Sequence, residues 1–207
     1  CGALCAPEAA NNPFRYKFSW SPKGVVMASN NNAQFLKNGE IVKLDTADLF
    51  KNPLEIDFPE VEKMEVYPNR DSLSYIDIYG IPETKTMYRG TFRYKNWCDA
   101  FDLLKALHLT SINEIDTRGK SYAQVTAKLN GFNSDNLKED IKAKFNLQEN
   151  DIGLKAIEWL GLFDSKNIDE EKTTPFELVS NLMMDKMMLS DNERDMVIMQ
   201  HIFNITK

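Results

Sequence analysis

The sequence predicts an α+β fold, in which a mixed β-sheet domain with helices is followed by a small all-helical subdomain. Before residue 109, apolar residues alternate with polar residues in several short segments, as expected of half-buried strands. After residue 109, apolar residues recur every three or four positions, which is typical of amphipathic helices. We therefore expect a sheet domain at 1–109, a helical subdomain at 110–190 and a strand at 191–207 that returns to the sheet.

Aromatic residues and a turn signal define the first elements of the sheet domain. A strand is expected at 13–20, where an aromatic residue occupies every second position from Phe14. Ser21 and Pro22 then start a short helix, because serine is a good N-cap and proline fits the first helical position. Asn38-Gly39 is a strong hairpin signal, so an antiparallel strand is expected on each side of it.

Four more elements complete the expected sheet domain: a strand at 63–67, a helix from Asp71 or Ser72 to Gly80, a strand at 84–94 and a helix at 96–108. Gly80 suits the left-handed conformation that often ends a helix. Arg70 is placed just before a helix N-terminus, where free amides and the helix dipole favour an anion.

The helical subdomain is predicted from three segments with helical periodicity, at 122–129, 137–145 and 154–160. Its last helix starts at Thr174, with Pro175 at the first helical position and Glu177 completing a capping box. The apolar run at 196–205 is short enough to be the returning strand.

Composition excludes several classes of function. The net charge of -6 disfavours nucleic acid as a partner, which needs clustered Lys and Arg. No apolar run approaches the roughly 20 residues that span a bilayer, so no membrane partner is expected. The cysteines Cys1, Cys5 and Cys98 are odd in number and match no zinc spacing, so neither a metal site nor a disulfide framework is favoured. A reducing, cytoplasmic compartment fits best.

The strand expected at 84–94 carries the main chemical signal. Its period of two places Arg89, Thr91 and Arg93 on one face, opposite an apolar core face. Such a surface suits a ligand with several carboxylates, because each guanidinium can bind one in a bidentate fork. Arg70 adds a third donor. In the competing interpretation, these arginines pair with some of the 31 acidic side chains of the chain.

Six blocks of sequence resemble saccharopine dehydrogenase, in the family's order and with closely similar spacing. They lie at 1–8, 16–22, 67–72, 89–94, 158–162 and 193–197. The resemblance covers nearly the whole chain and includes the bifunctional aminoadipate semialdehyde synthases of animals and plants. Phe92 and Ala3 replace the more usual leucine and glycine.

The resemblance implies an oxidoreductase of lysine metabolism. Such an enzyme interconverts saccharopine with glutamate and 2-aminoadipate 6-semialdehyde by hydride transfer linked to NADP, or to NAD. The implied residue roles are saccharopine binding by Arg70, Thr91, Phe92 and Arg93, a catalytic position beside the reacting centre for Cys1, and cofactor contacts for Trp20 and Ser21.

The family normally opens with a Rossmann domain that carries a glycine-rich turn, and this sequence contains no such turn. We therefore expect a fragment that supplies the substrate-binding half, is inactive alone, and leaves NADP to be bound mainly by the missing Rossmann domain. A homodimer is compatible with this interpretation. Two alternatives stay open: an imine reductase of polyamine synthesis that resembles carboxynorspermidine dehydrogenase, and a non-catalytic small-molecule-binding module.

Overall fold

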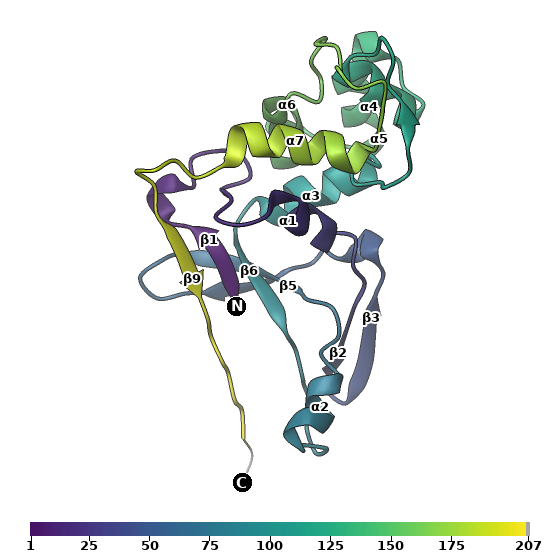
Figure 1. Ribbon diagram of the computed structural model, residues 1–207. Coiled ribbons are helices and arrows are strands. Elements are labelled where there is room, and N and C mark those ends of the chain that lie inside the picture. Colours follow the sequence, from purple (N-terminus) through teal and green to yellow (C-terminus); the bar gives the residue numbers. More distant parts are fainter. Residues whose placement is uncertain (206–207) are drawn as a thin grey trace.

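The computed structural model describes residues 1–205, and five of its strands form two neighbouring groups below most of the helices (Figure 1). Three of them form an antiparallel sheet in the order β4 (Leu54–Asp57), β5 (Lys63–Pro68) and β6 (Gly90–Tyr94). The other two, β1 (Gly2–Cys5) and β9 (Asp195–Ile198), form an antiparallel pair. The strand β9 near the C-terminus therefore pairs with the strand β1 near the N-terminus, and a strand forms after residue 190 as expected.

Two hydrogen bonds connect these two groups of strands. The Cys1 nitrogen donates to the Gly90 carbonyl oxygen at 3.2 Å, and the Phe92 nitrogen donates to the Cys1 carbonyl oxygen at 3.2 Å. In parallel strands, one residue forms hydrogen bonds with the two residues that flank its partner on the other strand, and Cys1 does so with the two residues that flank Thr91. The α+β fold with mixed strand directions, predicted from the sequence, is confirmed.

The hairpin of β2 (Ala33–Lys37) and β3 (Glu40–Leu44) also forms as predicted. Asn38 and Gly39 both have positive φ values, 54° and 86°, as a tight turn between twisted strands requires. The edge of β2 that does not face β3 is hydrogen-bonded to the turn after β5, since the Gln34 nitrogen donates to the Arg70 carbonyl oxygen at 2.9 Å. This bond fixes the position of Arg70.

Helices cover the upper side of the strands (Figure 1). They are α1 (Pro22–Ala28), α3 (Trp97–Ala106), α4 (Tyr122–Asn130), α5 (Leu137–Phe145), α6 (Ile152–Leu160) and α7 (Pro175–Met187), while α2 (Ser74–Tyr79) lies at the opposite end. Three short 3-10 helices lie at Pro7–Ala9, Thr46–Asp48 and Ser134–Asn136. The helix α1 packs against α7, and α3 packs against α6.

One hydrophobic core runs from the sheet into the helices. It includes Met64 and Phe92 of the sheet, Phe101 of α3, and Ile157 and Met183 of the later helices. The division at residues 109 and 190 stays our proposal, because the two parts share this core. Within residues 1–205, no helix is both long and apolar enough to cross a membrane.

Several predicted elements are wrong or shorter than expected. The expected strand at 13–20 is irregular, because the Asn12 side chain accepts a hydrogen bond from the Phe14 nitrogen at 3.0 Å and Arg15 adopts a φ of 49°. The expected strand at 84–94 is regular only over β6. After Ile198 the described chain has no regular structure, although the returning strand was expected over 191–207, the last two residues of which lie outside the described range.

Four strands were not predicted, namely β1, β4 and the two-residue strands β7 (Ile115–Asp116) and β8 (Lys172–Thr173), which pair with each other. Helix starts were predicted better. The side chains of Ser21 and Thr174 accept hydrogen bonds from Gly24 and Glu177 nitrogens at 3.3 and 3.1 Å. The capping box is incomplete, since the Glu177 carboxylate accepts from the Thr173 hydroxyl instead.

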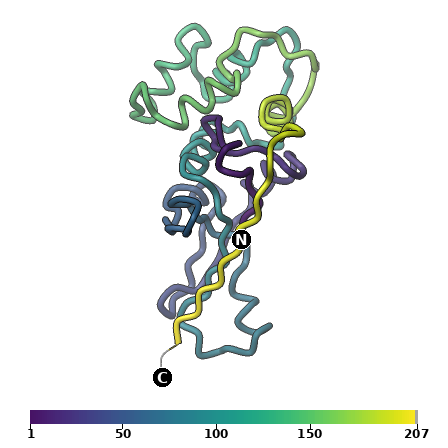
Figure 2. The backbone as a smooth tube through the Cα atoms, turned by 90° about the vertical axis from the view of Figure 1, so that its left-hand side faces the viewer, coloured from purple at the N-terminus to yellow at the C-terminus, as the bar shows by residue number. Residues whose placement is uncertain are grey.

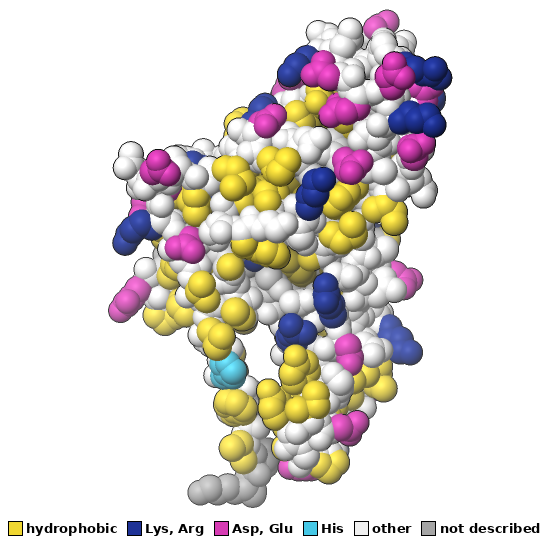
Figure 3. Space-filling model, in the orientation of Figure 1, with side chains coloured by type: hydrophobic (Ala, Val, Ile, Leu, Met, Phe, Trp, Pro, Cys, Tyr) yellow, Lys and Arg dark blue, Asp and Glu magenta, His cyan; other side chains and the backbone are white. Residues whose placement is uncertain are grey.

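The backbone of the described residues after β9 is extended and runs away from the helices (Figure 2). Its apolar side chains are exposed, and so are those at the end of α2 (Figure 3). The exposed apolar residues of these two segments are Ile78, Tyr79, Met199, Ile202, Phe203 and Ile205.

Candidate functional site

The candidate site lies where β1 meets β6. Cys1 is exposed, carries a free thiol and lies against the backbone of Gly90 and Phe92. The close approach of the two strands requires Gly2, because an added Cβ there would lie 2.7 Å from the Phe92 carbonyl oxygen. Thr91 is half-buried, and Phe92 is buried with its ring 5.8 Å from that of Phe58. The Phe92 side chain therefore contributes to the core.

Arg93 is buried, with 4% of its surface exposed. Its guanidinium carbon lies 4.9 Å from the ring centroid of Tyr16, 5.1 Å from that of Trp97 and 5.9 Å from that of Tyr67. The sequence predicted that Arg93 would lie on an open polar face, and this expectation is wrong, because α3 and the irregular segment before Ser21 cover that face. We call Tyr16, Tyr67 and Trp97 the aromatic cage of Arg93.

The Arg93 guanidinium has no carboxylate partner among the described residues. One terminal nitrogen donates to the Phe92 carbonyl oxygen at 2.8 Å, and the buried Nε has no acceptor. The buried indole nitrogen of Trp97 also lacks an acceptor within residues 1–205. Buried polar groups are almost always paired, so two unpaired donors in one cage indicate a position for an acceptor that the described chain does not supply.

The acidic residue opposite Arg93 in the sheet does not neutralise it. Glu65 pairs with Arg93 in the register of β5 and β6, but its carboxylate accepts hydrogen bonds from the Cys98 and Asn96 nitrogens at 3.1 and 3.4 Å. Burial raises the pKa of the Glu65 carboxyl, and these hydrogen bonds at the start of α3 oppose the rise. Glu65 thus caps α3 and leaves Arg93 available.

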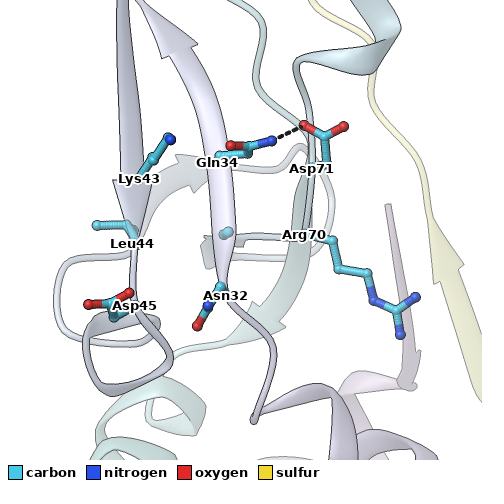
Figure 4. A pocket seen from close by; sticks show the side chains of 8 residues that line it. Asn32, Gln34, Lys43, Leu44, Asp45, Arg70 and Asp71 are labelled. Carbon is cyan, nitrogen blue, oxygen red and sulfur yellow. Dashed lines mark hydrogen bonds between the residues drawn. The ribbon is translucent and has the colours of Figure 1, made fainter.

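Arg70 and Arg89 lie together at the outer end of the same strands. The Asn69 nitrogen donates to the Arg89 carbonyl oxygen at 2.9 Å, so the turn that carries Arg70 is bonded directly to Arg89. Arg70 has a φ of 58° and borders a cavity of about 300 Å³ between β2, β3 and the turn. In Figure 4 its side chain points away from the other lining residues, toward the side where β1 and β9 lie. The Arg70 side chain therefore points toward β1 and away from that cavity.

The ion pairs of the chain separate its six arginines into two groups. Three have a carboxylate partner: Arg15 with Glu62 at 2.7 Å, Arg118 with Asp116 at 2.8 Å and Arg194 with Glu8 at 2.6 Å. Arg70, Arg89 and Arg93 have no ion pair in the part of the chain that the structure describes. Arg93 lies in β6, Arg89 lies directly before it, and Arg70 lies in the turn that is hydrogen-bonded to Arg89.

Trp20 and Ser21 follow the irregular segment that carries Tyr16. The Tyr16 hydroxyl donates to the Ala3 carbonyl oxygen of β1 at 3.3 Å. Burial raises the pKa of Tyr16, while the charge of Arg93 and a side-chain hydrogen bond with Trp20 oppose that rise. Trp20 is 46% exposed, so its indole lies beside the cage and still faces solvent. The Ser21 hydroxyl caps α1.

Sequence reasoning did not identify the aromatic cage as part of the site. Trp97 was assigned to an apolar helix face and Tyr16 to a strand. One signal was available, because Tyr16 and Tyr67 are the first residues of two of the blocks that resemble the family. Within residues 1–205 no group of three or more His, Cys, Asp or Glu residues is placed to hold a metal ion.

Comparison with known proteins identifies the family. The family model described as saccharopine dehydrogenase C-terminal domain matches residues 1–207. The chain belongs to this family. The resemblance found in the sequence blocks is thereby confirmed.

Relatives and a solved structure of the saccharopine dehydrogenase family extend the comparison. The chain is 34% identical over 214 residues to saccharopine dehydrogenase [NADP(+), L-glutamate-forming] of Saccharomyces cerevisiae, covering 99% of this chain and 48% of that protein. It is 34% identical over 215 residues to the mitochondrial alpha-aminoadipic semialdehyde synthase of Bos taurus, covering 99% of this chain and 23% of that protein.

The structure is similar to apo histidine-tagged saccharopine dehydrogenase (L-Glu forming) from Saccharomyces cerevisiae. The TM-score is 0.80 and the sequence identity 30%, over 94% of this chain and 45% of that chain. The chain thus spans about half the length of the yeast relative, and less of the bovine one.

Proposed function

We propose that this chain is the substrate-binding part of an oxidoreductase of lysine metabolism. The complete enzyme interconverts saccharopine with glutamate and 2-aminoadipate 6-semialdehyde by NADP-linked hydride transfer. The relatives support this proposal, since they are named as saccharopine dehydrogenases and aminoadipic semialdehyde synthases. We propose substrate-binding roles for Arg70, Thr91, Phe92 and Arg93.

The buried Arg93 is the observation that carries this proposal. A buried cation without a carboxylate partner is costly unless a ligand supplies the counter-charge. Saccharopine has three carboxylates, and a carboxylate can accept two parallel hydrogen bonds from a guanidinium. A carboxylate at Arg93 would also provide acceptors near the unpaired Arg93 Nε and the Trp97 indole nitrogen.

The described residues also fit one edge of a nicotinamide cofactor. Trp20 offers a half-exposed indole face next to Tyr16, and Ser21 begins α1 beside it. Phosphate groups need a glycine-rich turn at a helix start, which this sequence does not contain. NADP would therefore contact Trp20 and Ser21 here and be held mainly by a Rossmann domain of the complete protein. When bound, it supplies or accepts the hydride.

The chain's own residues position the substrate. A guanidinium offers five N–H donors and no acceptor, so the arginines orient the carboxylates of the substrate. Burial of the cage excludes water from Arg93, which strengthens its attraction for an anion. Cys1 lies at the solvent-exposed end of β1, beside Thr91, and we place it next to the reacting carbon and nitrogen of the substrate.

Location and assembly stay predictions. The sequence favoured a cytoplasmic location and allowed a homodimer. The bovine relative is named as a mitochondrial protein.

The test is turnover by the full-length protein. Purified full-length protein should convert saccharopine, NADP+ and water to glutamate, the semialdehyde, NADPH and a proton. The reaction is followed by the absorbance of NADPH and by chromatography of glutamate. Carboxynorspermidine should give a much lower rate. A protein that oxidises carboxynorspermidine but not saccharopine, or neither compound, would remove the proposal.

A further inference from the structure

Arg89 is an unpaired arginine that is not among the four proposed substrate-binding residues. It lies directly before β6, and its side chain is exposed. Its guanidinium carbon lies 5.6 Å from the ring centroid of Tyr75 in α2. Arg89 forms no ion pair with any carboxylate in residues 1–205, as noted above for all three arginines near β6.

We propose that Arg89, held over Tyr75, is a further carboxylate-binding residue of this site and selects for substrates that carry a third carboxylate. For the identity of the substrate, this inference rests on the proposed function. The geometry behind it is independent of that identity and has three parts.

The first part is the contact with Tyr75. A guanidinium that stacks on an aromatic ring uses its flat face, whereas its five N–H donors point outward in the plane of the group. The contact therefore restricts the orientation of Arg89 without occupying a donor. A carboxylate can then bind to a side chain that has already lost part of its conformational freedom.

The second part is the backbone around Arg89. Its nitrogen donates to the Ser72 hydroxyl at 3.0 Å, and its carbonyl accepts from the Asn69 nitrogen at 2.9 Å. Arg70 lies between these two partners in the sequence, so Arg70 and Arg89 belong to one hydrogen-bonded unit. Their spacing is set by the backbone and not by flexible loops.

The third part is the absence of competition from Asp71, the acidic residue adjacent to Arg70. Its carboxylate accepts hydrogen bonds from the Leu73 nitrogen at 2.9 Å and from the Gln34 side chain at 3.0 Å. Hydrogen bonds from the Leu73 nitrogen and from Ser74 lower the pKa of Asp71. Its negative charge is thus stabilised by the turn, and it forms no ion pair with Arg70 or Arg89.

The distance between Arg89 and Arg93 sets the length of ligand that could contact both residues. Arg93 follows Arg89 by four positions of extended chain, which is at most about 13 Å between their Cα atoms. Thr91 lies midway between them, and Cys1 contacts Gly90 beside it. A ligand with carboxylates at both ends can contact buried Arg93 with one and exposed Arg89 with another, while its middle passes Thr91 and Cys1.

The experiment compares Arg89→Met with Lys85→Met in the full-length protein. Both variants remove one positive charge from an exposed side chain of the same segment, and Lys85 forms no ion pair in the described chain. Arg89→Met should raise the KM for saccharopine about tenfold, as expected for one charge-assisted contact. Lys85→Met, the KM for NADP and the melting temperature should stay near wild type. Tyr75→Leu keeps the charge and should raise the KM about threefold.

A second measurement uses inhibitors that need no turnover. Tricarballylate has three carboxylates and glutarate has two. Arg89→Met should therefore weaken the binding of tricarballylate more than the binding of glutarate, and Arg89→Lys should bind tricarballylate more tightly than Arg89→Met does. If wild-type protein does not oxidise saccharopine, the proposed function fails, and calorimetric binding of the two inhibitors still tests Arg89. Equal constants for Arg89→Met and Lys85→Met would overturn the inference. So would a lower melting temperature with an unchanged KM, because Arg89 would then serve only to attach α2.

Discussion

Replacing Arg93 by methionine in the full-length protein tests the buried guanidinium directly. Methionine keeps an unbranched apolar stem between the three rings and removes the charge. A charge-assisted hydrogen-bonded contact contributes about 1.5 to 3 kcal/mol, so kcat/KM for saccharopine should fall roughly 10 to 150-fold. The KM for NADP should barely change, because Trp20 and Ser21 are unaltered.

The structure also sets the expected effect on stability. The Arg93 guanidinium has one hydrogen bond, to the Phe92 carbonyl oxygen, and no carboxylate partner in residues 1–205. Losing its contacts with the rings destabilises the fold, whereas removing a buried unpaired charge stabilises it. Because these effects oppose each other, we expect the melting temperature to change by less than about 4 °C, which corresponds to roughly 1 to 2 kcal/mol for a chain of this size.

Arg118→Met is the matched control, since Arg118 is ion-paired with Asp116 on the surface of the helical region. It should leave kcat/KM unchanged. Saccharopine kinetics and thermal unfolding are measured on the same preparations. If Arg93→Met lowers the melting temperature by more than about 8 °C and leaves the KM for saccharopine near wild type, Arg93 is structural and the reasoning from its missing partner is wrong.

Three further predictions follow from other parts of the chain. The isolated 207-residue chain should produce no NADPH or NADH from saccharopine above a buffer blank, because it lacks the phosphate-binding turn; measurable turnover would contradict this. Burial lowers the pKa of Lys105 to about 8, so the free energy of unfolding should rise as the pH increases from 8 toward 10.5, and denaturant titrations should show a smaller rise for Lys105→Met. Gly90→Ala would place a Cβ 2.3 Å from Val66 Cγ1 and should lower stability by about 1 to 3 kcal/mol, whereas Thr91→Ala should have a smaller effect on urea unfolding.

The sign of the Lys105 prediction follows from the folded state. Its amino group donates to the Ser29 carbonyl and the Thr46 hydroxyl, and no carboxylate forms an ion pair with it in the described chain. Burial of this amino group disfavours its charged form and outweighs the attraction of Asp102, so the unfolded chain binds a proton at a higher pH than the folded chain does. Between pH 10.5 and 8 that difference favours unfolding progressively as the pH falls, and below pH 8 it is constant. Parallel curves for wild type and Lys105→Met would contradict the lowered pKa.

Local signals in the sequence predicted local structure well. The turn at Asn38-Gly39, the N-caps Ser21 and Thr174 and the left-handed Gly80 all depend on residues within a few positions of one another. Strand predictions failed where that condition did not hold. The strand β1 forms only because β9, nearly 200 residues later, and β6 lie beside it. Nothing within its four residues distinguishes it from a loop.

The sequence by itself determined the fold class, the helices of the second half, the family and the cluster of arginines near β6. It could not determine which arginines have carboxylate partners, because pairing depends on distances between residues far apart in the chain. Only the tertiary structure places Tyr16, Tyr67 and Trp97, from three separate segments, around Arg93. It also directs Glu65 to the start of α3, so that Arg93 is left buried and unpaired. Alternation along a strand gives the face of a side chain, but what covers that face is decided by the packing of other elements.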